Sequence, residues 1–304
     1  MTIKAAGATV AALVSFAFAG PAAAQDLGPR VKKFADGVYA FVGENYNSNA
    51  GIVLTQDGVV LIDSGHNPIE SRKLAEIVKQ LTPMPVRLLV DTEPHPDHTT
   101  GHFMFPTATV VAAAGAGESM RGREREDPQR IQKLAATSPE MKAALEGYKF
   151  IVPHVEYQQK ASLAVGERSF ELMYLKGVHS EADTAIWLPK ERVLFSASGI
   201  VVNQINILRP FVTIPDILAA SKMMKALNPE HVIPGHGIPG TVKIFEDTEK
   251  YYALLVERVE KLVKEGKTLE QIKQEVKMPE YAHWASQERF PTNVEAAYKM
   301  VVAK

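Results

Sequence analysis

Short apolar runs separated by turn residues organise the chain from residue 38 onward. Their length and composition predict strands, and these runs cover residues 38–42, 52–54, 59–62, 86–90, 107–113, 162–165, 169–175, 184–188, 192–196 and 231–233. Apolar residues at helical spacing predict helices, and these segments cover residues 68–81, 128–148 with an interruption near 138–139, and 215–227. Strands therefore alternate with helices twice along the chain. Such alternation favours an α/β protein in which two sheets pack face to face with helices outside.

The pattern changes to amphipathic helices from Val242 onward. Apolar residues from Tyr252 to Leu262 lie on one helical stripe with charged residues between them. Thr268 is placed to cap the N-terminus of a second helix, and a last helix is predicted from Asn293. We expect this extension to cover one sheet of the same domain. The alternative is that the exposed edge of the stripe forms the contact of a homodimer.

The N-terminus carries the features of a signal peptide. Lys4 precedes an apolar stretch over 5–20, and Ala22–Ala24 supplies the small residues of a cleavage site. We therefore expect residues 1–24 to be removed and residues 25–304 to form a single domain, with its helical extension beginning at about residue 242. The form of the signal predicts a periplasmic or secreted bacterial protein. The chain contains no cysteine, so export would bring no disulfide bonds.

The charge composition indicates which classes of partner the protein can bind. The 304 residues carry a formal net charge of −1 at pH 7, and Lys and Arg are spread along the chain. The sequence thus lacks the basic footprint of a protein that binds nucleic acid or an anionic membrane. We expect a small-molecule substrate, with no nucleic acid and no membrane as partner. The densest charged stretch, Arg121–Asp127, alternates in sign and predicts a solvated loop.

The segment Glu93–His98 is the strongest chemical signal in the chain. It places two imidazoles and two carboxylates within six positions, directly after the strand predicted at 86–90. Imidazole nitrogen and carboxylate oxygen are ligands of zinc and of its harder neighbours manganese and iron. His179 and His236 each follow another predicted strand and a turn that contains glycine. Together these residues predict a metal site at the ends of several strands.

In this order the motifs resemble those of the metallo-β-lactamase superfamily. The matching segments are residues 49–54, 58–65, 93–98, 101–102, 177–180, 193–196 and 234–237. The resemblance covers nearly all of the chain past residue 35, and it implies a four-layer αββα sandwich.

Two departures from the family pattern are informative. Glu93 stands where the family usually has the first histidine of its His-x-His-x-Asp-His motif. Ser198 stands where many members have an aspartate that bridges two metal ions. A serine at this point is similar to the third subclass of zinc β-lactamases, some of which also replace the first histidine with Gln or Glu. The resemblance thus implies a site that is binuclear in outline with one unusual half.

The resemblance also implies which residues hold metal. One ion would be held by Glu93, His95 and His179, and the other by Asp97, His98 and His236. We expect one or two zinc ions, with iron or manganese as alternatives at the half that contains Glu93, because an added carboxylate favours harder ions.

Three further residues are expected to support the site rather than bind metal. Asp63 follows a predicted strand and would orient a ligand. Ser198 would hydrogen-bond a water at the site, and Asn203 would reach the pocket and polarise a substrate carbonyl. His66 and His102 flank the site in sequence and are expected to pack or to support ligands.

These observations predict an exported metal-dependent hydrolase. By resemblance, a metal-bound hydroxide attacks a carbonyl, and Asp97 both binds metal and orients the nucleophile. A β-lactam or another cyclic amide or ester is the expected substrate. The alternatives are an iron-dependent oxidoreductase on the same fold, a lactonase or esterase without β-lactamase activity, and a degenerate binding protein without catalysis.

Overall fold

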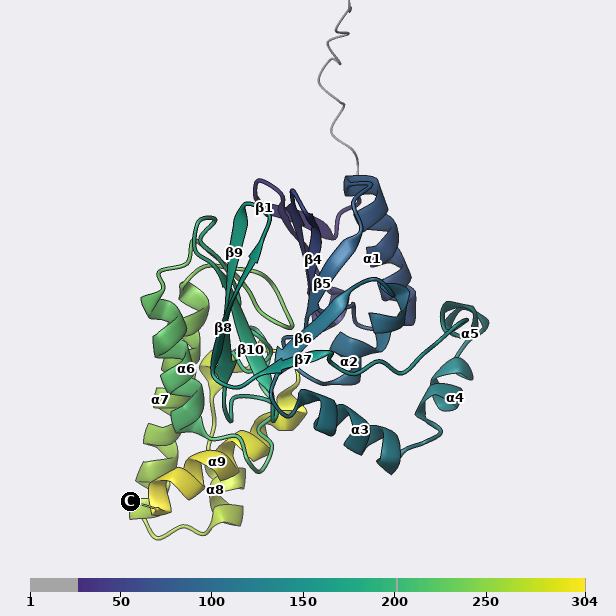
Figure 1. Cartoon of the computed structure of the whole chain (residues 1–304). Coiled ribbons are helices and arrows are strands. Elements are labelled where there is room, and N and C mark those ends of the chain that lie inside the picture. The colour runs from purple at the N-terminus through teal and green to yellow at the C-terminus, as the bar shows by residue number, and fades with distance from the viewer. Residues whose placement is uncertain (1–26, 201, 304) are drawn as a thin grey trace, which may run out of the picture.

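A computed structural model describes residues 27–200 and 202–303 of the chain. Two β-sheets pack face to face, and helices cover the outer face of each sheet (Figure 1). This is the four-layer αββα sandwich expected from the sequence. The segment predicted to be a signal peptide, residues 1–24, lies outside the described residues.

The first sheet joins an antiparallel meander to a parallel half. Its strands, in spatial order, are β1 (Val31–Ala35), β2 (Val38–Phe41), β3 (Ala50–Thr55), β4 (Gly58–Ile62), β5 (Val86–Val90), β6 (Thr109–Ala113) and β7 (Val155–Tyr157). Neighbours from β1 to β4 pair antiparallel, and neighbours from β4 to β7 pair parallel. Because β4 and β5 run in the same direction, the residues that follow them emerge at the same edge of the sheet.

The second sheet brings another set of strand ends to that edge. Its strands, in spatial order, are β12 (His231–Ile233), β11 (Val193–Phe195), β10 (Asp183–Leu188), β9 (Arg168–Leu175) and β8 (Lys160–Val165). Strands β11 and β12 pair parallel, whereas β8 to β11 pair antiparallel. Strands β9, β11 and β12 therefore share one direction, and each is followed by a loop at the same end of the sandwich.

Helices form the two outer layers. Those that follow strands of the first sheet are α1 (Pro68–Leu81), α2 (Pro96–Thr99), α3 (Ala116–Glu126), α4 (Arg130–Ala135) and α5 (Pro139–Ala144). Those in the second half of the chain are α6 (Ile214–Ala226), α7 (Lys243–Lys264), α8 (Leu269–Glu275) and α9 (Phe290–Val302). Short 3-10 helices occur at Glu44–Tyr46, Thr100–Met104, Pro279–Tyr281 and Gln287–Arg289.

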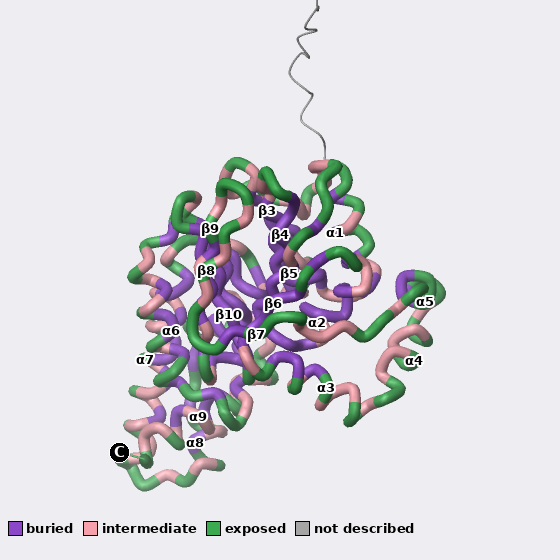
Figure 2. The backbone as a smooth tube through the Cα atoms, in the orientation of Figure 1, coloured by how far each residue is buried: buried purple, intermediate pink, exposed green. Residues whose placement is uncertain are grey.

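Three buried apolar clusters hold the layers together. Figure 2 shows that buried residues gather on the strands in the middle of the molecule. The middle cluster lies between the sheets, where Ile62 of β4 and Phe170 of β9 are almost fully buried. A second cluster joins the first sheet to Leu74 of α1, and a third joins the second sheet to Leu255 of α7. Burying one such side chain contributes roughly 1.5–3 kcal/mol. The two sheets are thereby fixed against each other, and so are the loops at their shared edge.

The C-terminal extension packs on the second sheet, which is the first of the two arrangements expected from the sequence. Helix α7 contributes a stripe of buried residues, including Tyr252 and Val259, to the cluster under that sheet. Thr268 caps α8 as predicted, and its capping box pairs it with Gln271. The last helix begins at Phe290, slightly before the predicted Asn293.

The prediction of a solvated loop over Arg121–Asp127 was wrong, because this stretch continues helix α3 as far as Glu126. Two side-chain pairs support the helix. Arg123 donates to Ser119 Oγ at 2.8 Å, and Arg125 lies 2.5 Å from Glu118. Alternating charge indicated solvent exposure correctly, but the buried face of the helix starts earlier, at Ala116 and Met120. The helical spacing of apolar residues therefore could not be recognised from the charged stretch alone.

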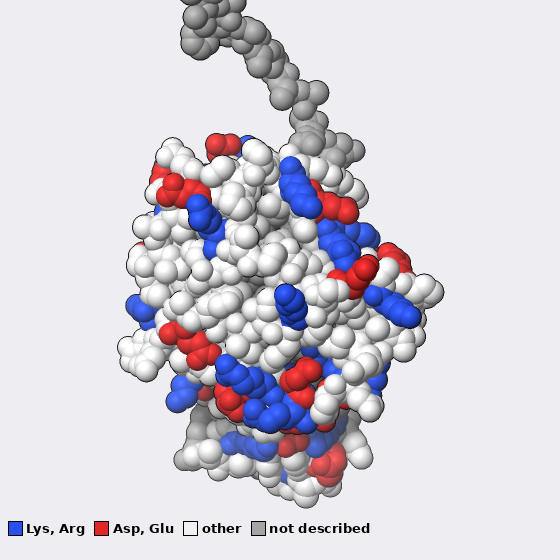
Figure 3. Space-filling model, turned by 45° about the vertical axis from the view of Figure 1, so that its right-hand side comes forward, with Lys and Arg blue, Asp and Glu red and all other residues white. Residues whose placement is uncertain are grey.

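The surface agrees with the balanced composition. Positive and negative side chains are mixed over the face drawn in Figure 3. Among the described helices, none has both the length and the apolar character needed to cross a bilayer.

Candidate metal centre

Every predicted ligand follows the end of a strand. Glu93 lies shortly after β5 in the first sheet, and His179 and His236 lie shortly after β9 and β12 in the second sheet. Two hydrogen bonds tie these ends together across the sandwich. The amide of Thr184 donates to the carbonyl of Thr92 at 2.7 Å, and that of Asn49 donates to the carbonyl of Gly235 at 2.7 Å. Residues distant in sequence are thus held at one site.

The local conformation of the Glu93–His98 segment separates its side chains. His95 precedes α2, and its carbonyl accepts from the amides of His98 and Thr99, so the chain makes one turn here. Glu93 and His98 are fully buried, and His95 is 8% exposed. The side chain of Asp97 is 31% exposed, which makes it the most accessible carboxylate of the motif. A single turn therefore points three groups inward and leaves one facing the surface.

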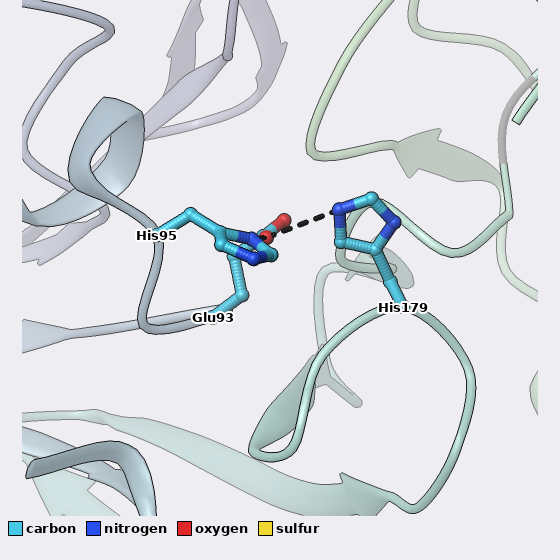
Figure 4. Close-up of side chains that lie close together, drawn as sticks. All are labelled: Glu93, His95 and His179. Carbon is cyan, nitrogen blue, oxygen red and sulfur yellow. Dashed lines mark hydrogen bonds and ion pairs between the residues drawn. The ribbon is translucent and has the colours of Figure 1, made fainter. Parts of the chain in front are cut away.

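One candidate metal position lies between Glu93, His95 and His179, whose ligand atoms are within 4.8 Å of one another. Figure 4 shows His179 reaching across from its own loop to the carboxylate of Glu93, against which His95 is packed. His179 Nε2 is 3.3 Å from Glu93 Oε2, and His95 Nδ1 contacts the same oxygen. The two imidazole rings meet edge to face, with centroids 5.2 Å apart.

A second candidate position lies between Glu93, His98 and His236, whose ligand atoms lie within 4.8 Å of one another. Asp97, expected here from the sequence, is not a member of this group in the described residues, and Glu93 takes its place. His98 Nδ1 donates to Asp63 Oδ2 at 2.8 Å, and His236 Nδ1 donates to the carbonyl of Tyr46 at 2.8 Å. Each ring thus has a proton on Nδ1 and turns Nε2, the atom that a metal ion would use, inward. These two Nε2 atoms are 3.2 Å apart. Two nitrogen atoms at that distance repel each other unless a cation, either a proton or a metal ion, lies between them.

Further ligand atoms surround that point. Asp97 Oδ2 is 3.3 Å from His236 Nε2 and 3.8 Å from His98 Nε2. Glu93 Oε1 lies 3.2 Å from His98 Nε2. Donor atoms that share one tetrahedral ion at about 2.1 Å lie about 3.4 Å from one another. The spacing and the chemistry of these donors therefore fit a divalent ion.

Burial is the largest single influence on the pKa values of these groups. The charges of neighbouring groups decide whether each pKa is finally raised or lowered. Burial lowers the pKa of His179 to about 3, so its imidazole is neutral. Burial opposes ionisation of Glu93 and Asp97, but the neighbouring histidines hold the pKa of both carboxyls below the ordinary range. For His98, burial opposes the charged form, yet the carboxylates, Glu93 first, raise its pKa well above the ordinary value. Without a metal ion, a proton supplies the positive charge that the site requires.

Asp63 holds His98 in place. Its carboxylate accepts hydrogen bonds from His98 Nδ1, from the amide of Thr92 at 2.7 Å and from Thr92 Oγ1 at 2.6 Å. The backbone of Asp63 adopts a positive φ of 60°, a conformation that is rare for a residue other than glycine. Asp63 thus lies where its predicted supporting role requires.

Asn49 supports His236 in a similar way, and the sequence analysis did not single it out. Its Nδ2 donates to the carbonyls of Pro234 at 2.7 Å and Gly237 at 2.9 Å, which flank His236. Its Oδ1 accepts from the amide of Gly43 at 2.8 Å. A buried asparagine between two loops could have been suspected from its place in the resembling segment 49–54.

Ser198 and Asn203 lie differently with respect to the ligands. Ser198 is buried beneath the turn that carries His236, and a Cβ at Gly235 would come within 2.2 Å of its Oγ. That Oγ has no hydrogen-bond partner among the described residues. Asn203 uses its backbone carbonyl to accept from the amide of Ala285. The hydrogen bonds found in the described part of the chain do not connect its side chain to the metal ligands.

Two arginines beside the site were also missed by the sequence analysis. Arg209 Nη1 donates to His179 Nε2 at 3.2 Å and to the carbonyl of His179 at 2.9 Å. Arg123 of α3 approaches the carbonyl of Pro94 at 3.4 Å and is 3.7 Å from Glu181. Both guanidinium groups therefore flank the half that contains Glu93. No motif marked them, because their proximity depends on the fold.

The two flanking histidines have separate environments. His66 Nδ1 accepts from the amide of Ser48 at 3.2 Å and lies 3.8 Å from Asp97 Oδ2. His102 is buried and pairs with Asp91 at 2.8 Å. Within the described residues, neither histidine belongs to a group that could hold a metal ion.

Known proteins share this sequence pattern and fold. The sequence profile of the metallo-beta-lactamase superfamily matches residues 43–236, which is more than half of the chain. The stereoselective inverting sec-alkylsulfatase Pisa1 from Pseudomonas sp. superposes with a TM-score of 0.68 at 20% identity, over 89% of this chain and 50% of that one. This chain thus spans about half the length of that sulfatase.

Two β-lactamases are similar over nearly their whole length. A metallo-beta-lactamase from Pontibacter korlensis gives a TM-score of 0.56 at 20% identity, over 72% of this chain and 95% of that one. The DIM-1 metallo-beta-lactamase, in a structure exposed to ceftazidime, gives 0.56 at 15% identity, over 73% and 94%. At these identities the likeness is one of fold.

The profile match therefore establishes the family independently of the structural likeness, and the αββα architecture agrees with it. The candidate metal groups lie at the strand ends where the matched motifs place them. The chain belongs to the metallo-β-lactamase superfamily, a family of metal-dependent hydrolases.

Proposed function

We propose that the protein is an exported hydrolase that cleaves a small cyclic amide or ester, with a β-lactam as the leading substrate. The observation that carries this proposal is the pair of facing Nε2 atoms of His98 and His236, with the carboxylates of Asp97 and Glu93 beside them. This donor set fits one or two divalent ions, with zinc as the expected metal. When bound, such ions supply the Lewis acidity that activates water and polarises the scissile group.

The side chains of this protein have separate roles in binding metal and in orienting the attacking water. The rings of His98 and His236 are held in orientation by Asp63 and by the carbonyl of Tyr46, so they need not rotate to bind a metal ion. Asp97 is ionised and partly exposed, so it can accept a hydrogen bond from an attacking water. Asp97 is therefore the residue proposed to orient the nucleophile.

A hollow beside Asp97 suits a small molecule. Its volume is about 650 Å³, within the usual range for ligand sites. The residues that line it come from the metal loop and from helices α4 and α5, and include His66, Asp97, Thr100, Arg130, Leu134 and Met141. Apolar and charged groups thus meet next to Asp97, the residue proposed to orient the nucleophile. This combination supports a compact substrate with both kinds of group.

A sulfate ester is the second candidate substrate, and Arg209 favours it. Its guanidinium donates to the same Nε2 lone pair of His179 that a metal ion would use. One lone pair cannot serve both, so metal binding would turn Arg209 towards a bound anion. The structural likeness to a sec-alkylsulfatase supports the same substrate class.

A substrate panel with metal analysis on the same sample tests these proposals. The panel contains a chromogenic cephalosporin, a lactone, an aryl ester and a secondary alkyl sulfate, and metals are measured by mass spectrometry. Zinc with hydrolysis of the cephalosporin or lactone supports the first proposal, and selective sulfate release supports the second. Iron with no hydrolysis would favour the oxidoreductase, and the absence of metal would favour a degenerate binding protein.

Asp97→Ala is the decisive variant, with Asp127→Ala as its matched control. Both carboxylates line the hollow, but Asp97 Oδ2 lies 3.3 Å from His236 Nε2, whereas Asp127 pairs with Lys133 at 2.6 Å. We expect Asp97→Ala to abolish turnover and to remove about one equivalent of metal. Asp127→Ala should retain both. Wild-type turnover in Asp97→Ala would refute the role of Asp97.

A further inference from the structure

Glu93 faces both candidate metal positions with different atoms. Its Oε2 lies with His95 and His179, 3.3 Å from His179 Nε2. Its Oε1 lies 3.2 Å from His98 Nε2, on the side of His236. Among the described residues, Glu93 is the one member common to the two groups that could hold a metal ion. Its position therefore differs from that of a ligand to a single ion.

The surroundings of Glu93 leave Oε1 available for such a role. The side chain is fully buried, and Oε1 has no hydrogen-bond partner among the described residues. A buried carboxylate oxygen that accepts no hydrogen bond is costly, because it has lost its hydration. A cation next to Oε1 would remove that cost, and His98 Nε2, a potential metal ligand, lies 3.2 Å from the same oxygen.

We propose that Glu93 bridges the two metal positions, with one carboxylate oxygen directed to each. This inference rests on the metal-dependent hydrolysis proposed above, but it concerns metal binding, which is measured without substrate. In many relatives a bridging aspartate occupies the place of Ser198. Here Ser198 offers a neutral hydroxyl, so the bridging charge comes from position 93 on the opposite sheet instead.

The chemistry of the side chain explains why glutamate suits this position. A carboxylate has two acceptor oxygens on one carbon, so one buried group can serve two cations. A neutral imidazole has one lone pair and serves one cation. One negative charge between two dications also reduces their mutual repulsion. Binding of the first ion would thus fix Glu93 for the second, so the two ions should bind cooperatively.

Metal titrations of three variants test the bridge, with native mass spectrometry for stoichiometry and calorimetry for affinity. The wild type should bind two zinc ions, with the second at least as tightly as the first. Glu93→Gln should weaken both steps by about 10-fold or more, because it removes the shared charge. Glu93→His should keep one step and weaken the other by about 10-fold, because an imidazole serves one ion. Adding Ser198→Asp to Glu93→His should restore tight binding of both ions.

Glu191→Gln is the matched control, since the side chain of Glu191 is only 6% exposed, pairs with Arg168 and belongs to neither metal group among the described residues. Its titration should equal that of the wild type. Circular dichroism verifies that each variant is folded. The bridge is refuted if Glu93→His leaves both steps unchanged, if Glu93→Gln alters one step alone, or if the wild type binds a single ion. Failure of the proposed hydrolysis would leave these titrations unaffected, so the two proposals can fail separately.

Discussion

Asp63→Asn should weaken metal binding without unfolding the protein. Asp63 accepts hydrogen bonds from Thr92 and from His98 Nδ1 at 2.8 Å. Asparagine has nearly the same shape, and its carbonyl can still accept from the Thr92 amide. Its NH₂ group, however, would face the N–H of His98, and two donors cannot pair. The neutral imidazole, which is the form that binds metal, must then carry its proton on Nε2, the atom that faces His236.

The expected loss of zinc affinity follows from this change of tautomer. A proton on His98 Nε2 blocks the lone pair that a metal ion would use. Loss of such a supporting contact typically costs about 10- to 100-fold in metal affinity, which is about 1.4–2.7 kcal/mol. The free energy of unfolding should fall by about 1.5–3 kcal/mol, which is the typical contribution of one hydrogen bond to a charged group. The variant should therefore remain folded while it binds zinc more weakly.

Calorimetric titration with zinc, together with thermal unfolding of the metal-free protein, measures both quantities. Asp91→Asn is the control, because Asp91 is equally buried and pairs with His102 at 2.8 Å in the same way. His102 belongs to neither metal group among the described residues, so this control should change stability and leave zinc affinity intact. Equal zinc affinity in Asp63→Asn and the wild type would refute the reasoning about the tautomer of His98.

Four other predictions concern the site and the export of the protein. Asn49→Ala should lower the free energy of unfolding by about 2–4 kcal/mol, measured by urea denaturation, because two buried carbonyls and the amide of Gly43 lose their partner; an unchanged midpoint would contradict this. Arg209→Gln should raise KM for an anionic substrate about 10-fold and leave a neutral ester unaffected, and equal effects on both would argue against an anion site. Because the pKa of His98 is raised in the metal-free protein, zinc must displace its proton. Zinc affinity should therefore fall as pH falls, and calorimetry in buffers of different ionisation heat should detect about one released proton. Mass spectrometry of the native protein should find a mature N-terminus near Gln25, and an intact Met1 in the cytoplasm would rule out export.

Local patterns in the sequence were sufficient for most of the fold. The helix over 68–81 and the strand over 86–90 have the bounds expected from apolar spacing and turn residues. The cap at Thr268 was equally predictable, because a capping box involves residues three positions apart. Failures occurred where local signals conflict. The alternating charges of 121–127 indicated exposure, whereas the helical period of α3 was set by apolar residues that come before them.

The sequence also indicated which residues would form the site, because ligand-type side chains after strands are a local signal. The sequence could not place their individual atoms. His98 Nε2 and His236 Nε2 meet at 3.2 Å although 138 positions separate the two residues, and Arg209 reaches His179 across 30 positions. Such distances depend on how two sheets pack, and each lone pair depends on a partner from another loop. For that reason the two-sided position of Glu93 was decided by the tertiary structure alone.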